Sequence, residues 1–140
     1  MTTSGRATMT SIATKRLLIF DSVGGLLVGV CVLAFLSPLA AMEPQSSTVL
    51  MITGIANIVY GMYSGQLAVR ASRGARLASA ELRILIYANA AWLPVCFALA
   101  AGTASHASWL GIAHLVGEGI YVGVLAWFEQ RVFFRPEATA

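Results

Sequence analysis

The chain has 140 residues, of which 58% are hydrophobic and only 11% are charged. About a quarter of the residues of a soluble domain are charged, so this composition excludes an ordinary soluble protein and indicates an integral membrane protein in contact with a lipid bilayer. The net charge of +3 comes from scattered arginine and lysine residues and not from a nucleic-acid-binding motif, so we expect no nucleic-acid partner.

Four apolar segments are long enough to cross the membrane as helices, which takes roughly 20 residues each. They cover residues 17–36, 49–69, 84–101 and 109–128. Because the loops between them are short, we predict an all-α membrane protein: an antiparallel bundle of four transmembrane helices that forms a single domain over residues 17–130. Residues 1–16 and 131–140 are predicted to be tails, the first of them flexible.

The distribution of basic residues predicts the orientation of this bundle. All nine Lys and Arg residues lie before the first span, between the second and third spans, or after the fourth, and the connections 37–48 and 102–108 contain none. The positive-inside rule therefore places both termini and the middle loop in the cytoplasm, and we expect a multi-pass protein of a bacterial inner membrane.

Asp21 is the only acidic residue of the first span. A carboxyl inside a membrane is costly, so Asp21 is a candidate for binding a ligand or a proton. A pairing with Lys15 or Arg16 at the membrane surface is the alternative. The same basic residues before an apolar segment are also typical of a signal peptide, but this segment is too long for one. An organellar transit peptide is the remaining alternative to a tail.

The second and third spans contribute neutral polar groups. Asn57 and Tyr60 lie in the second span, and Asn89 lies in the third. All three are candidate ligand-binding residues, although asparagines in membrane helices also serve only to hold helices together, at on the order of 1 kcal/mol each. Ser79 is the predicted N-cap of the third helix, and Glu81 falls in its first turn, where an acidic side chain is favourable.

Glu118, near the centre of the fourth span, is the most informative residue of the chain. A carboxyl there needs a partner, a proton or a function. His114 lies one turn before it on the same helix face, because a spacing of four residues aligns the side chains. Tyr121 is a further polar candidate on this helix, whereas Trp92 of the third span is interpreted as a packing or interfacial residue.

Depth in the membrane, counted at about 1.5 Å per residue from the basic side, sorts these groups into two layers. The deeper layer, at about 14 to 18 Å, contains Glu118, Tyr60 and Asn57. The shallower layer, at about 6 to 8 Å, contains Asp21, Ser64 and Asn89. Polar groups avoid lipid, so we expect those of each layer to meet inside the bundle, with Tyr121 between the layers.

Two further patterns concern metals and packing. Cys31, Cys96 and His114 lie at about 18 to 21 Å by the same count, which makes them a weak candidate for a soft-metal site. The chain has no CxxC or HExxH motif, so we predict no metal and identify no cofactor. Three glycine pairs allow close helix contacts, within the monomer or across a homo-oligomer. These pairs are Gly25–Gly29, Gly61–Gly65 and Gly119–Gly123.

Three functional classes agree with these features. The first is a small transporter or ligand-binding bundle in which Glu118 exchanges a proton or a cationic substrate. The second is an accessory or assembly subunit of a membrane complex, whose polar residues and glycines serve packing alone. The third is a membrane enzyme that acts on a lipid-like substrate, with Glu118 or Asp21 as general acid or base and His114 as its partner. We favour the first class over the second, and a non-enzymatic role over catalysis.

Overall fold

The computed structural model describes residues 12–42, 47–105 and 108–134. These residues form five helices, and none of them forms a strand. The helices are α1 (Ile12–Ala34), α2 (Leu36–Met42), α3 (Ser47–Ser72), α4 (Ser79–Thr103) and α5 (Trp109–Phe133). All except α2 are long and apolar enough to cross a membrane, which confirms the prediction of an all-α, multi-pass membrane protein.

The helices extend beyond the predicted spans, because a helix can continue where water and lipid headgroups surround it. Residues 12–16, predicted to belong to a tail, form the start of α1, and α5 continues five residues past 128 to Phe133. Residues 1–11 and 135–140 of the predicted tails lie outside the described residues. The first predicted connection, 37–48, begins within a further short helix, α2. Pro38 lies in its first turn, where the missing N–H costs little.

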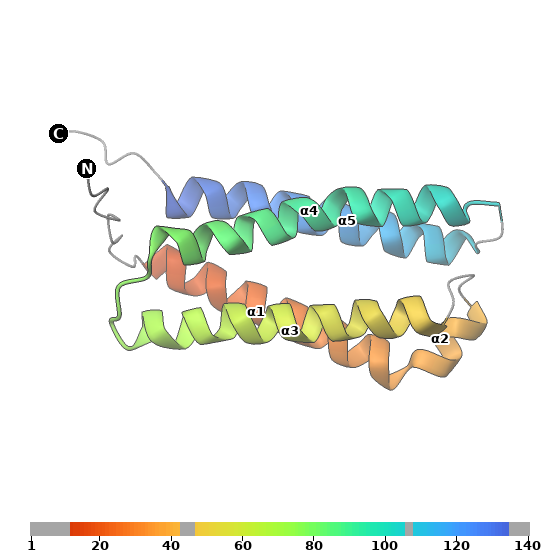
Figure 1. Ribbon diagram of the computed structural model, residues 1–140, viewed down its shortest axis with the longest axis horizontal. Helices are drawn as coiled ribbons and strands as arrows, with labels where there is room; N and C mark the ends of the chain where they lie inside the picture. Colours follow the sequence, from red (N-terminus) through yellow and green to blue (C-terminus); the bar gives the residue numbers. More distant parts are fainter. Residues whose placement is uncertain (1–11, 43–46, 106–107, 135–140) are drawn as a thin grey trace.

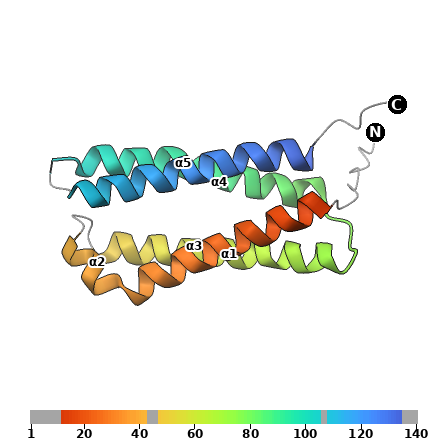
Figure 2. The same cartoon turned by 180° about the vertical axis from the view of Figure 1, so that it is seen from behind.

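The four long helices form two antiparallel pairs (Figures 1 and 2). Helix α1 packs along α3, and α4 packs along α5, while contacts between the two pairs are sparse. The start of α1, the connection between α3 and α4, and the end of α5 lie at one end of the bundle. We call it the basic end, because every described Lys and Arg lies in these segments or within a few residues of them.

Glycines bring α1 and α3 into backbone contact. A Cβ atom added to Gly29 would lie 2.7 Å from the Gly54 carbonyl oxygen, and one added to Gly61 would lie 2.7 Å from the Leu26 nitrogen. Gly119 and Gly123 of α5 instead lie against side chains of α4, those of Cys96, Phe97 and Leu93. The predicted glycine pairs therefore serve contacts within this chain. A homo-oligomer joined through these faces stays a prediction.

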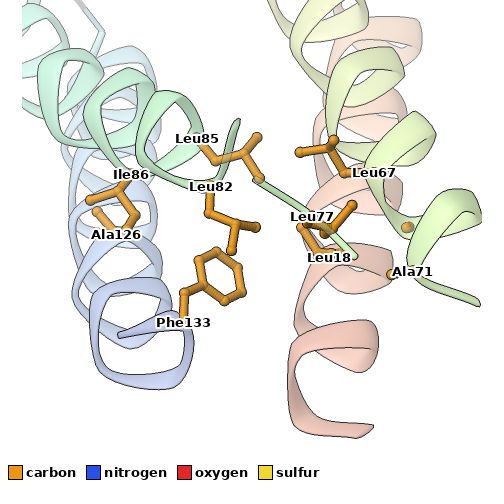
Figure 3. Packing of buried hydrophobic residues seen from close by; sticks show 10 residues of the cluster. Leu18, Leu67, Ala71, Leu77, Leu82, Leu85, Ile86, Ala126 and Phe133 are labelled. Carbon is orange, nitrogen blue, oxygen red and sulfur yellow. The ribbon is translucent and has the colours of Figure 1, made fainter. Parts of the chain in front are cut away.

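The two pairs are joined at the basic end by an apolar core (Figure 3). It contains Leu18 of α1, Leu67 and Ala71 of α3, Leu77 of the connection, Leu82, Leu85 and Ile86 of α4, and Ala126 and Phe133 of α5. Nearby, Arg70 and Glu81 form an ion pair between α3 and α4. Glu81 also accepts a hydrogen bond from the Ala78 N–H at 2.9 Å, so the N-cap is Ala78, one residue before the predicted Ser79.

Candidate functional site

Four side chains, one from each long helix, form a hydrogen-bonded cluster between the two pairs. The Tyr60 hydroxyl donates to Oδ2 of Asp21 at 2.8 Å. The Asn89 amide donates to the Tyr60 oxygen at 2.7 Å and to Oε2 of Glu129 at 3.1 Å. This cluster links α1, α3, α4 and α5, and its hydrogen bond from Asn89 to Tyr60 joins the two pairs.

Glu129 is the residue of this cluster that the sequence interpretation missed. The predicted fourth span stopped at residue 128, so Glu129 was not among the candidate residues, yet its side chain is fully buried. A signal was present in the sequence. Glu129 follows Glu118 by eleven residues, close to three full turns of an α-helix, so both carboxyls lie on one face of α5. The continuation of α5 past the apolar segment brings Glu129 beside Asn89.

The cluster has no cation among the residues that the structure describes. The ion pairs among the described residues lie outside the cluster and join Arg70 to Glu81 and His114 to Glu118. Neither Asp21 nor Glu129 takes part in an ion pair there. The groups next to the Asp21 and Glu129 carboxyls are neutral hydroxyls and an amide, and the two carboxyls also lie near each other. The pairing of Asp21 with Lys15 or Arg16, an alternative left open by the sequence, is absent.

One oxygen of Glu129 is also unpartnered. Its Oε1 atom is buried and finds no hydrogen-bond donor among the described residues. An unpaired polar atom in the interior is expensive, and an unpaired anionic oxygen even more so. The charge state of this carboxyl is therefore part of the chemistry of the cluster.

Glu118 lies in a separate polar contact farther from the basic end. The Trp92 indole N–H donates to Oε1 of Glu118 at 2.9 Å, and Nε2 of His114 lies 3.9 Å from Oε2. The predicted neighbour His114 is thus present, but Tyr60 contacts Asp21 instead. Asn57 donates to the Thr53 carbonyl of its own helix at 3.1 Å.

Helix pairing explains why the predicted layer does not assemble around Glu118. The depth count places Cα atoms along the membrane normal and does not specify which helices are neighbours. Helix α5 packs on α4, so Glu118 finds Trp92 of α4, whereas α3 packs on α1, so Tyr60 finds Asp21. Trp92, interpreted from sequence as a packing residue, is a polar partner of the central carboxyl.

A cavity of about 240 Å³ between the two pairs connects both polar groups. Its polar and aromatic lining consists of Asp21, Asn57, Tyr60, Asn89, Trp92, Glu118 and Tyr121. Small and apolar residues complete the wall: Gly24, Gly25, Val28, Ala56, Ala88, Val122 and Leu125. Every predicted ligand-binding residue except His114 therefore lines one cavity.

The cysteines belong to different environments. Cys31 is exposed on α1, and Cys96 is buried on α4 where that helix meets Gly119 of α5. The described residues contain no group of three or more His, Cys, Asp or Glu side chains placed to hold a metal ion. Cys31, Cys96 and His114 do not come together.

The chain has no significant match among protein-family models, curated proteins or solved structures. Its function is therefore inferred from the chemistry of the cavity.

Proposed function

We propose that this membrane protein binds a small cation with an apolar body in the cavity, and that it transports this cation across the membrane. Glu118 provides the negative charge that holds the ligand. The single observation that carries the proposal is the position of its carboxyl: it lines a cavity inside the membrane-spanning part of the bundle and is held there by Trp92. A carboxyl that only stabilised packing would not need a cavity.

The lining of the cavity suits an organic cation better than an inorganic one. The rings of Tyr60, Trp92 and Tyr121 reach the same space as the Glu118 carboxyl. Aromatic rings attract ammonium groups through their quadrupoles, and apolar walls favour the organic part of the ligand. Pockets for drug-sized molecules measure about 300 to 1,000 Å³, so a cavity of about 240 Å³ fits a smaller molecule.

The helix arrangement supports transport. Substrate sites of secondary transporters lie near the bilayer midplane, between structural units that move relative to each other. Here the cavity lies between two helix pairs that share an apolar core at the basic end and have few other contacts. An accessory subunit that used its polar residues for packing alone would be expected to fill this space.

We expect binding to depend on the Glu118 charge. Benzyltrimethylammonium combines a permanent positive charge with one aromatic ring, and its binding to the protein in lipid nanodiscs is measured by titration calorimetry. Glu118→Gln keeps the shape of the side chain and removes the charge. The affinity for benzyltrimethylammonium should therefore fall at least tenfold, which is about 1.4 kcal/mol of binding free energy. Thermal unfolding should change little.

The matched control is Glu81→Gln, the same chemical change at the basic end outside the cavity. The Glu81→Gln variant should bind benzyltrimethylammonium as tightly as the unmodified protein does. Equal binding by Glu118→Gln and the unmodified protein would contradict the role of Glu118. No saturable binding by any of them would place the accessory-subunit function ahead.

We also propose that the basic end faces the cytoplasm of a bacterial cell, as the positive-inside rule predicts. Two exposed serines lie at opposite ends of the bundle, Ser72 at the end of α3 and Ser105 after α4. In a variant without the native cysteines, an impermeant maleimide added to intact cells should label Ser105→Cys and leave Ser72→Cys unlabelled. The reverse labelling pattern would invert the orientation.

A further inference from the structure

The Asp21–Tyr60–Asn89–Glu129 cluster contains two acids in a space that suits one negative charge. Asp21 is 2% exposed and Glu129 is 0% exposed. With no basic residue in contact among the described residues, two ionised carboxylates would repel each other in a medium that screens charges poorly. Hydroxyl and amide donors offset the burial of one anion, but a pair of adjacent anions requires a positive charge between them.

We propose that Asp21 and Glu129 share a single proton and thereby form a proton-binding site at the wall of the cavity. The hydrogen bonds assign the proton. Asp21 accepts from Tyr60, as an anion does, whereas Oε1 of Glu129 has no donor among the described residues. An ionised Glu129 would leave a buried anionic oxygen unpaired, so the proton resides mainly on Glu129.

The groups that face this pair come from every neighbouring long helix. They are Tyr60 and Ser64 of α3, Asn89 of α4, and Tyr121 of α5. None of them is basic, so none neutralises a second negative charge. Tyr60 and Asn89 form a continuous hydrogen-bonded path between the two carboxyls, which allows the pair to behave as one unit in titration.

The same residues connect the shared proton to the ligand. Asp21, Tyr60 and Asn89 line the cavity and also belong to the cluster. This step rests on the proposed function. A monovalent cation in the cavity supplies positive charge beside Asp21 and favours ionisation of both carboxyls. One proton then leaves to the solvent for each cation that binds, so the total charge of the site is conserved and binding is coupled to proton release.

The shared proton is tested without any ligand. Infrared spectra of the protein in lipid nanodiscs at pH 7 should contain the C=O stretching band of a buried carboxylic acid. Glu129→Gln should abolish this band, because Asp21 keeps the Tyr60 donor and loses the neighbouring acid. In Asp21→Asn the band should be lost at a lower pH than in the unmodified protein, because the negative charge that favours the protonated form of Glu129 is gone. Glu118→Gln should retain the band. Glu129→Gln and Asp21→Asn both preserve side-chain shape. Either of these variants that folds tests whether the two acids share a proton.

Two results would overturn the shared proton: absence of the band in the unmodified protein at pH 7, or loss of the band at the same pH in Asp21→Asn and in the unmodified protein. The second would mean that burial alone keeps Glu129 protonated.

Coupling is tested by adding benzyltrimethylammonium in weak buffer and recording the pH. The unmodified protein should release a proton on binding, whereas Glu129→Gln should bind and release none. Binding without release from the unmodified protein would refute the coupling. Absence of binding would remove the proposed function together with the coupling, while the shared proton stands or falls with the infrared band.

Discussion

Replacing Gly29 with alanine should destabilise the protein by about 1 to 3 kcal/mol, the usual cost of forcing an extra methyl group into a closely packed interior. The added Cβ would lie 2.7 Å from the Gly54 carbonyl oxygen and 2.9 Å from the Ile58 nitrogen. Both are backbone atoms of α3, so no side-chain rotation relieves the clash. Helices α1 and α3 would have to move apart, and much of the packing between them would be lost.

Gly117→Ala is the matched control. Gly117 lies within α5, and a Cβ atom there would meet nothing within 4 Å. Alanine favours a helix over glycine by about 1 kcal/mol, so this variant should be neutral or slightly more stable. Denaturation in mixed detergent micelles measures both. Equal stability of the two variants would mean that α1 and α3 do not touch through Gly29.

Asn89→Ala should have the second large effect, a loss of about 3 kcal/mol, because a buried group left without a partner costs about 1 to 3 kcal/mol and a charged one more. The Asn89 amide is the hydrogen-bond donor to Glu129 and also donates to Tyr60. Its removal breaks the hydrogen bond between α4 and α3 and leaves Glu129 without a hydrogen bond among the described residues.

Asn57→Ala provides the comparison for this effect. Its amide donates to a backbone carbonyl of its own helix, so it holds no other helix in place. We expect a change within about 0.5 kcal/mol, as for substitutions away from packing and polar networks. Thermal unfolding of both variants in the same nanodiscs checks the difference. If both asparagines matter equally, the cluster does not join the pairs.

The sequence determined the all-α class and the four long apolar helices of this fold through local properties. Four apolar segments of sufficient length specify four membrane helices, because a backbone in lipid must satisfy its own hydrogen bonds. The sequence also identified Asp21, Asn89 and Glu118 as polar groups within apolar segments, with a surface pairing of Asp21 left open. It could not give the helix ends, because no change in hydrophobicity marks where a helix stops. Glu129 was missed for that reason.

Only the tertiary structure decided which polar groups meet. Side-chain partners depend on helix neighbours, and four antiparallel helices with short loops admit several arrangements that bury the same residues. Because α1 packs on α3, Tyr60 is the hydrogen-bond partner of Asp21. Because α4 packs on α5, Trp92 is the partner of Glu118. A spacing within one helix, such as that of His114 and Glu118, was readable from sequence because helix geometry fixes it. Contacts between helices were not, because packing of the whole bundle fixes them.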